Sequence, residues 1–233
     1  MGYYDGCELV GLREARNYYS WLIQEFRPAV RGKVIEVGAG IGVFSEYLLG
    51  LPIEELICLE PACNLIPLLT RRLSRERVRV FSETLKRFAA NNSELFDSVV
   101  YVNVLEHIED DHQSLVIINR LLKAKGSLCL FVPAIPWLYG ALDKSFGHYR
   151  RYSKGQLENL LIRSGFKVCT LKYFHATGVL TWTLMGKILR WNSWDSRSVK
   201  LYDQIVTPII CRIERTISPP LGQSLLSIGV KVD

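Results

Sequence analysis

The sequence predicts a single α/β domain whose strands form a mainly parallel sheet. Short apolar runs alternate with amphipathic segments of helical length, and no long linker divides the 233 residues. A hydrophobic fraction of 48%, with eleven Tyr and five Trp, supplies enough apolar surface for one substantial core. We therefore expect one globular domain rather than a disordered or multidomain chain.

The predicted elements follow one another in a regular order. A leading helix at residues 8–26 precedes strands at 33–37, 55–59, 78–81, 96–102 and 127–132, which are separated by helices at 43–49, 62–73, 84–90 and 110–123. Lysines in the last turn and Gly126 beyond it indicate where the fourth of these helices stops. A capping box of Ser153 and Gln156 begins another helix, which Gly165 ends, and the last two strands are predicted at 167–174 and 223–232.

A glycine-rich turn, Glu36-Val37-Gly38-Ala39-Gly40-Ile41-Gly42, follows the first strand. Glycines let the backbone turn sharply and approach a ligand closely, and the next helix offers its positive N-terminus. The third glycine comes one residue earlier than in the dinucleotide fingerprint, and no G-K-[ST] is present. These differences argue against a nicotinamide-dependent oxidoreductase and against a phosphate-binding P-loop.

Two carboxylates lie at the ends of successive predicted strands. Glu36 would repel a diphosphate and suits a ligand with an ammonium group. Glu60 can accept hydrogen bonds from both hydroxyls of a ribose. The alternatives are a solvent-linked turn residue for Glu36 and a helix N-terminal acid for Glu60.

Together these motifs resemble those of the class I S-adenosylmethionine-dependent methyltransferases, most clearly over residues 33–132. The resemblance implies a Rossmann-like, doubly wound sheet of seven strands with an antiparallel last strand. The forty or so residues between the last two predicted strands indicate a helical insertion before the last one. The resemblance also implies S-adenosyl-L-methionine as the cofactor, with the methionine part at the glycine turn, the ribose at Glu60, the adenine edge at Ser82 and Glu83, and the sulfonium near Asn103. The implied cofactor-binding residues are Glu36, Gly38, Gly40, Gly42, Glu60, Pro61, Ser82, Glu83 and Asn103.

The run after the fourth strand, Asn103-Val104-Leu105-Glu106-His107-Ile108, resembles family members that methylate small molecules. It differs from the N-P-P-Y motif of members that methylate exocyclic amines of nucleic-acid bases, which disfavours nucleic acid as a partner. The net charge of +6 and an arginine cluster at residues 71–79 remain compatible with a solvated surface.

Methyl transfer to a hydroxyl requires removal of a proton, and His148, His107 and Asp143 are the candidate catalytic residues. Tyr149, Arg150 and Arg151 are expected to bind the substrate, since the two cations could clamp a phosphate or carboxylate. The alternative is a structural lid held by aromatic packing and salt bridges, with His107 shaping a turn.

We divide the domain, residues 1–233, into a leading helix (1–31), a cofactor-binding core (32–132), an active-site loop (133–152) and a helical insertion facing substrate or membrane (178–219). Long loops in compact domains tend to be functional. The insertion is net basic, and Trp182, Met185 and Leu189 are its candidate membrane contacts.

We expect an S-adenosylmethionine-dependent methyltransferase that acts on a small or lipid/glycan-linked acceptor, with oxygen as the favoured atom. The alternative is a non-catalytic S-adenosylmethionine-binding scaffold that docks a partner or a membrane enzyme. We expect a cytoplasmic protein with peripheral membrane contact left open, no metal site, and six reduced, buried cysteines. The acceptor and the oligomeric state are not specified by the sequence.

Overall fold

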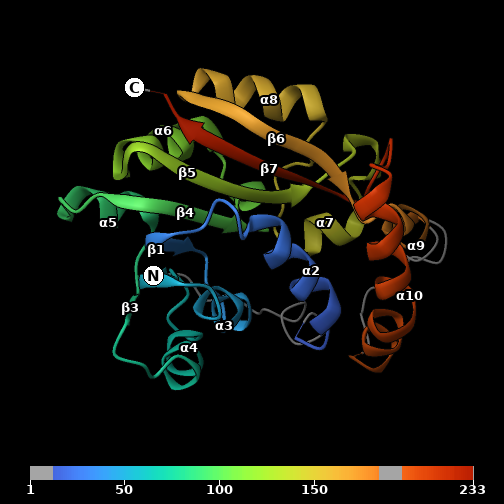
Figure 1. Cartoon of the computed structure of the whole chain (residues 1–233), viewed down its shortest axis with the longest axis horizontal. Helices are drawn as coiled ribbons and strands as arrows, with labels where there is room; N and C mark the ends of the chain where they lie inside the picture. The colour runs from blue at the N-terminus through green and yellow to red at the C-terminus, as the bar shows by residue number, and fades with distance from the viewer. Residues whose placement is uncertain (1–12, 184–195, 233) are drawn as a thin grey trace.

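The computed structural model describes residues 13–183 and 196–232, which form a seven-stranded sheet covered by helices on both faces (Figure 1). The strands are β1 (Gly32–Val37), β2 (Ile53–Leu59), β3 (Val78–Phe81), β4 (Phe96–Val102), β5 (Leu122–Pro133), β6 (Phe166–Phe174) and β7 (Ser224–Lys231). Their order is β3-β2-β1-β4-β5-β7-β6, and β7 runs antiparallel to both of its neighbours. The predicted seven-stranded sheet with an antiparallel last strand is confirmed.

Two groups of helices cover the two faces of this sheet. Helices α5 (Leu85–Asn91), α6 (Asp111–Leu121) and α8 (Lys154–Arg163) share one apolar core with it, and α2 (Arg16–Phe26), α3 (Val43–Leu49) and α4 (Ile66–Arg72) share the other. The strand order reverses between β1 and β4, which lie side by side. Ligands of open α/β sheets bind at the carboxyl ends of the strands at such a reversal.

Helix α6 ends earlier than predicted. It stops at Leu121, and β5 begins at once at Leu122, so the expected stop at Gly126 is wrong. The reason is tertiary: Leu122 is fully buried and pairs with Phe96 of β4, which draws the following residues into the sheet despite their helical pattern.

The predicted loop at residues 133–152 contains two short helices, η2 (Pro136–Leu138) and α7 (Ala141–Ser145). The capping box that begins α8 is confirmed, because the Ser153 hydroxyl accepts from Gln156 N and the Gln156 side chain accepts from Ser153 N. Gly165 follows α8 with a φ of +84°, as expected for a glycine that ends a helix.

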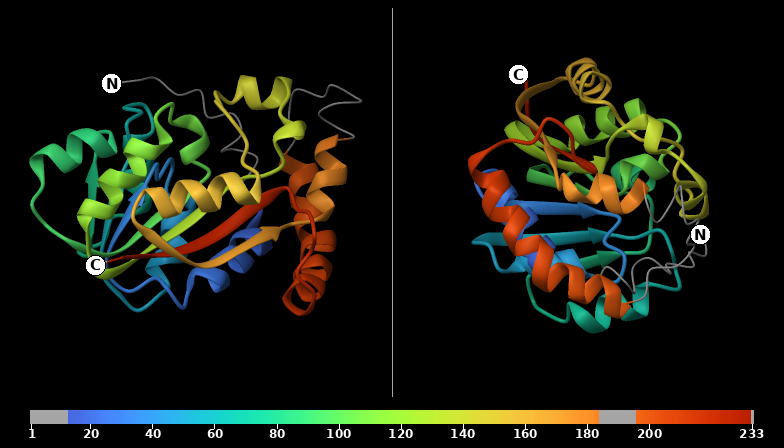
Figure 2. Two further views of the ribbon diagram at one scale, coloured as in Figure 1. Left: turned by 90° about the horizontal axis from the view of Figure 1, so that it is seen from above. Right: turned by 90° about the vertical axis from the view of Figure 1, so that its right-hand side faces the viewer.

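Two helices of the region before β7 are described: α9 (Thr177–Trp182) and α10 (Ser196–Thr216). Helix α10 lies across one end of the molecule, beside α2 (Figure 2). Its Asp203 carboxylate accepts hydrogen bonds from Asn17 N and Tyr18 N at 2.8 and 2.9 Å, in the first turn of α2. Because those N–H groups have no partner within α2, Asp203 caps that helix from a distant segment. Helix α2 begins at Arg16, and residues 8–12 of the predicted leading helix lie outside the described residues.

The cysteines are only in part as predicted. Cys58 and Cys129 are buried, but Cys63 and Cys169 are exposed, and Cys7 lies outside the described residues. The five described cysteines are free thiols.

Over residues 13–183 and 196–232, no helix is both long enough and apolar enough to cross a membrane.

The Asp203 cap can be tested by urea unfolding. Asp203→Ala should lower the free energy of unfolding by about 1–3 kcal/mol, because it leaves two N–H groups of α2 without their acceptor. Gln204→Ala is the matched control, since Gln204 is the exposed neighbour on the same helix and should change stability by less than about 0.5 kcal/mol. Equal effects of the two substitutions would contradict the cap.

Candidate functional site

The predicted cofactor residues come together at the carboxyl edge of β1 and β2. Gly38 N and Ala39 N donate to Leu59 O at 2.8 and 3.1 Å, which joins the glycine turn to the end of β2. Glu60 then accepts from Gly40 N through Oε2 and from Ala62 N through Oε1, both at 2.8 Å. Burial raises the pKa of Glu60, and these two hydrogen bonds partly offset that rise.

All three glycines of the turn have a backbone conformation that favours glycine. Gly38, Gly40 and Gly42 have φ values of +71°, +56° and +80°, a region that other residues rarely adopt. A Cβ on Gly38 would also lie 2.5 Å from a Val104 methyl, and one on Gly42 would lie 2.9 Å from Leu69. The turn therefore keeps its shape only with glycine at these positions.

Glu36 lies beneath this turn, where it is 3% exposed. Its carboxylate accepts a hydrogen bond from the Ser45 hydroxyl of α3 and contacts Cys58 Sγ at 3.8 Å. Burial raises the pKa of Glu36 to about 7, although the hydrogen bonds from Ser45 and Cys58 lower it. A cation placed next to Glu36 would favour the ionised form, so its protonation is coupled to any cationic ligand of the turn.

The remaining predicted cofactor residues follow β2, β3 and β4 on the same edge. Pro61 is exposed, Ser82 is partly buried, and Glu83 is partly buried and pairs with Arg87 at 3.6 Å. Asn103 adopts a φ of 54°, and its N–H donates to Phe131 O of β5 at 2.9 Å. A non-glycine residue in this conformation is uncommon and marks the turn after β4 as a constrained position.

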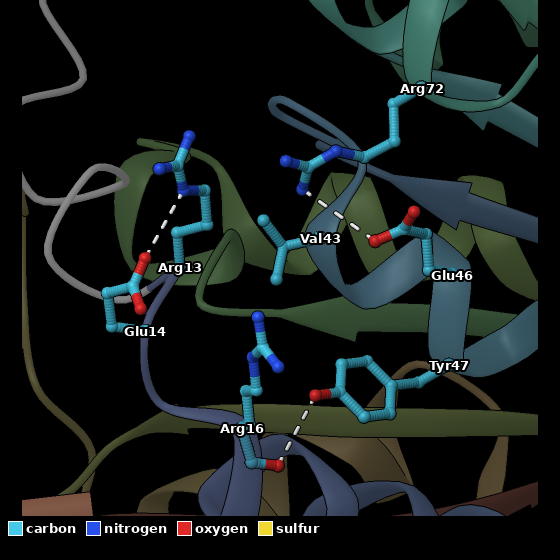
Figure 3. A pocket seen from close by; sticks show the side chains of 7 residues that line it. All are labelled: Arg13, Glu14, Arg16, Val43, Glu46, Tyr47 and Arg72. Carbon is cyan, nitrogen blue, oxygen red and sulfur yellow. Dashed lines mark hydrogen bonds and ion pairs between the residues drawn. The ribbon is translucent and has the colours of Figure 1, made fainter. Parts of the chain in front are cut away.

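A separate pocket of about 470 Å³ lies beside α3 (Figure 3). It is lined by Arg13, Glu14, Arg16, Val43, Glu46, Tyr47 and Arg72. Its ion pairs, Arg13 with Glu14 and Arg72 with Glu46, are long, at 3.6 and 3.9 Å. Its lining includes none of the predicted cofactor residues.

A second cluster follows β4 and β5, around the fully buried Asp143 of α7. Asp143 Oδ1 lies 2.9 Å from His148 Nδ1 and 2.7 Å from Arg151 Nε, and Oδ2 accepts from Gly140 N at 3.0 Å. Burial alone would raise the pKa of Asp143, but the hydrogen bonds from His148 and Arg151 outweigh it, so the pKa is lowered. An ionised Asp143 holds the His148 ring, and with the proton on Nδ1 the Nε2 lone pair is available as a base.

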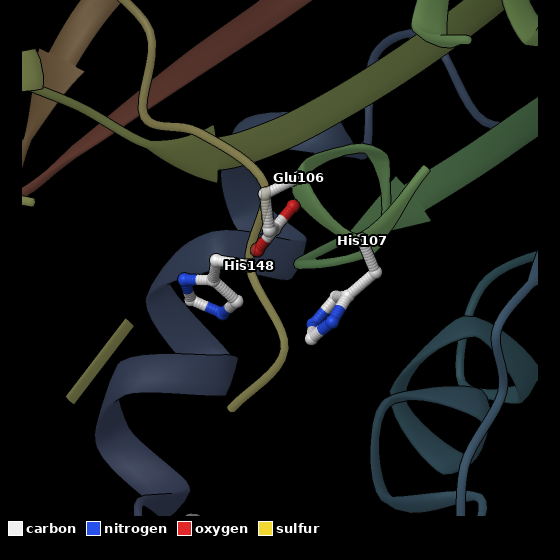
Figure 4. A group of neighbouring side chains, drawn as sticks. All are labelled: Glu106, His107 and His148. Carbon is white, nitrogen blue, oxygen red and sulfur yellow. The ribbon is translucent and has the colours of Figure 1, made fainter. Parts of the chain in front are cut away.

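Glu106 and His107, directly after β4, complete this cluster (Figure 4). The His107 and His148 rings are perpendicular, with centroids 4.7 Å apart. Both Glu106 carboxylate oxygens are buried without a hydrogen-bond partner among the described residues, and burial raises the pKa of Glu106 to about 7. Burial, followed by repulsion from His148, lowers the pKa of His107 to about 4. One ligand atom from each of these three residues lies within 4.8 Å of the others, so the cluster is also compact enough to hold a metal ion.

The three predicted substrate-binding residues have different surroundings. Arg151 is 4% exposed, pairs with Asp143 and lies 4.4 Å from the Trp182 ring centroid. Arg150 pairs with Asp111 at 2.8 Å and is half-buried, whereas Tyr149 is exposed. Of these, Tyr149 has the side chain most open to an incoming molecule, and the charge of Arg151 is already balanced by Asp143.

Glu106 was not among the candidate site residues of the sequence. A signal was present, because Glu106 and His107 are adjacent polar residues in an otherwise apolar run after a predicted strand. What the run does not specify is that η1 (Leu105–His107) turns Glu106 into the interior, close to His148 and Arg151.

Comparison with known proteins identifies related sequences. A family model described as "Methyltransferase domain" matches residues 12–171. The mitochondrial ubiquinone biosynthesis O-methyltransferase of Dictyostelium discoideum is 26% identical over 106 residues, which make up 41% of this chain and 33% of that protein. This chain therefore matches about a third of the length of that relative.

Solved structures share the fold at low sequence identity. One is a chain from the complex of the Haloferax volcanii Trm112 methyltransferase activator with a proposed methyltransferase, which has a TM-score of 0.69, 13% identity, and coverage of 98% of this chain and 95% of that chain. Another is the N-methyltransferase NodS of Bradyrhizobium japonicum in complex with S-adenosyl-L-homocysteine, with a TM-score of 0.61, 14% identity, and coverage of 94% and 87%.

The coupling between Glu36 and a cationic ligand gives a test by calorimetry. S-adenosylhomocysteine, which carries an ammonium group, should bind more tightly as the pH rises from below to above about 7, because Glu36 then ionises and attracts it. Titrations in two buffers of different ionisation enthalpy should show proton release near neutral pH. Glu36→Gln should weaken binding by about tenfold, the effect of ~1.4 kcal/mol, and remove the pH dependence.

The same substitution has an opposite effect on the free protein. The folded-state pKa of Glu36 is raised from 4.5 to about 7, so its contribution to stability falls as the pH rises through that window. Glu36→Gln should therefore raise the Tm at pH 8 and leave it nearly unchanged at pH 4.5. If Glu36→Gln instead bound S-adenosylhomocysteine as tightly as the wild type above pH 7, Glu36 would have only a structural role.

Proposed function

This chain belongs to the methyltransferase domain family, with S-adenosylmethionine as its methyl donor, and from that premise we propose that it methylates a hydroxyl oxygen of a small or lipid-linked acceptor. The observation that carries this proposal is the pair of His148 and Asp143, 2.9 Å apart on the segment after β5. Family membership also favours catalysis over the alternative of a non-catalytic scaffold.

The residues at the strand ends fit this cofactor by their chemistry. Glu60, with each oxygen fixed by one backbone N–H, retains lone pairs that can accept from the two ribose hydroxyls. Glu36 provides the negative charge for the ammonium group. Because Gly38 and Gly42 have no side chain, the backbone of the turn can approach the ligand closely. When bound, the cofactor supplies an electrophilic methyl group on a sulfonium.

His148 acts as the general base in this proposal. Its Nε2 would take the proton of the acceptor's hydroxyl, so that the oxygen could accept the methyl group that the bound cofactor would supply. Asp143 is a positioning residue, because its carboxylate holds Nδ1 and stabilises the imidazolium that forms. Asp143 is itself held by hydrogen bonds from Gly140 N and Arg151 Nε. The Arg151 guanidinium in turn packs on the Trp182 ring.

Oxygen is favoured over nitrogen as the acceptor atom for two reasons. A neutral hydroxyl must lose its proton during transfer, and a partly exposed histidine held by a buried aspartate suits that task. The Dictyostelium relative is also an O-methyltransferase by name.

We propose that the acceptor binds next to the exposed Tyr149 and to Arg150, which pairs with Asp111, and that its polar head group contacts these residues.

The base can be tested by following tritiated methyl transfer from S-adenosylmethionine into an organic-solvent extract of the source cells and into its aqueous fraction. His148→Gln should lower the rate by about 10²- to 10⁴-fold and leave S-adenosylhomocysteine affinity unchanged. Asp143→Asn should lower the rate less and change the shape of the pH–rate profile. Ile162→Gln, an exposed position on α8, is the neutral control.

A metal-dependent reaction is the competing outcome, since Glu106, His107 and His148 lie close enough to hold an ion. The base proposal expects full activity after dialysis against EDTA. Loss of activity that Mg²⁺ or Zn²⁺ restores would overturn it, as would a His148→Gln variant that transfers methyl groups at the normal rate.

A further inference from the structure

Helix α10 presents large aliphatic side chains to solvent along its whole length. Leu201, Ile205, Ile209, Ile213 and, directly after the helix, Ile217 recur every four residues and are each between 51% and 66% exposed. A spacing of four residues winds slowly along one side of a helix. We call these five residues the outward face of α10. Single exposed aliphatic residues are ordinary, but five in succession on one helix are not.

The opposite side of α10 meets the rest of the protein through buried acids and a few apolar residues. Asp203 and Glu214 are buried, and each accepts two backbone hydrogen bonds: Asp203 from the first turn of α2, and Glu214 from His175 N and Ala176 N before α9. Tyr202 adds a bond to Thr177 at 2.8 Å. Helix α10 is thus held by buried acids as well as by Val199, Ile210 and Cys211, which pack against the core. Four of its large aliphatic side chains, Leu201, Ile205, Ile209 and Ile213, remain exposed to solvent.

The exposed charges of α10 all have one sign. Its two acidic residues, Asp203 and Glu214, are both turned inward, whereas Arg197, Lys200, Arg212 and Arg215 are exposed. A helix with a basic, apolar outer surface matches the chemistry of an anionic bilayer surface, where aliphatic side chains enter the boundary and cations meet lipid phosphates. At 21 residues, α10 is about 30 Å long.

The position of α10 relates this surface to the candidate site. In Figure 1, β4 and β5 point toward the end of the molecule where α7, α9 and α10 lie, and Figure 2 shows α10 across the outside of that end. Trp182, which was expected to contact a membrane, is instead 7% exposed and packs on Arg151, so that prediction is wrong, and Met185 and Leu189 lie outside the described residues.

We propose that the outward face of α10 docks this protein onto the surface of an anionic membrane, with the helix lying in the plane of the interface. This inference rests on the proposed function and extends it, since docking would place His148 and Asp143 next to a hydroxyl group of a membrane lipid. A second copy of the chain fits this face less well, because two α10 helices packed face to face would bring their exposed cations together.

Vesicle co-sedimentation tests the proposal on the intact chain. The wild type should sediment with phosphatidylcholine vesicles that contain phosphatidylserine, much less with phosphatidylcholine alone, and less at high salt. The triple variant Ile205→Gln, Ile209→Gln and Ile213→Gln should lose at least about tenfold in partitioning, because buried apolar area drives interfacial binding. Arg212→Gln with Arg215→Gln should selectively reduce the dependence on phosphatidylserine.

The control variant carries Leu68→Gln and Ile162→Gln, which are equally exposed on α4 and α8 and should sediment like the wild type. S-adenosylhomocysteine titration of every variant reports on the fold and the cofactor site independently of vesicles. Absence of wild-type sedimentation, equal sedimentation of the triple variant, or a stable dimer that the triple variant converts to monomer would each overturn the membrane proposal. Vesicle binding without methyl label in the lipid fraction would leave docking in place and reject the lipid acceptor.

Discussion

The buried carboxylate of Glu60 connects the two turns on which the site depends. Its oxygens accept from Gly40 N in the turn after β1 and from Ala62 N in the turn after β2, so neither turn can move without losing a buried hydrogen bond. Parallel pairing of β1 with β2 and β4 brings the following turns to the same edge. The positive φ values of Gly38 and Gly42 complete this arrangement, and the cofactor's polar groups would meet fixed acceptors rather than mobile loops.

Buried acids organise the rest of the molecule in the same manner. Asp143 fixes His148 and Arg151 in the segment after β5, and Asp203 and Glu214 connect α10 to the first turn of α2 and to the residues just before α9. Each acid accepts at least two hydrogen bonds, which offset the cost of burying it. Because these hydrogen bonds hold part of α10, four of its large aliphatic residues do not pack against the core and remain exposed for the proposed membrane contact.

Local patterns predicted most of the fold. The alternation of strands and helices, the glycine turn and the capping box at Ser153 are encoded within a few residues of each other, and the structure has all three. Interactions between distant residues were not predictable. The end of α6 is set by Leu122 pairing with Phe96 and the start of α2 by Asp203, and the charged groups that act on Glu106 belong to residues that follow β5. In the candidate site, the sequence indicated His107, Asp143 and His148, but it did not indicate that Arg151 forms a buried ion pair with Asp143.

The most direct test of the cofactor site is isothermal titration calorimetry with S-adenosylhomocysteine on the wild type, Glu60→Ala and the exposed control Glu54→Ala. The account predicts micromolar binding by the wild type and the control, and a loss of about 1–3 kcal/mol in Glu60→Ala, the usual size of a lost hydrogen bond to a charged group. Circular dichroism and urea unfolding of each protein establish that it is folded. A folded wild type that binds no S-adenosylhomocysteine, or a Glu60→Ala variant that binds as tightly as the wild type, would contradict it.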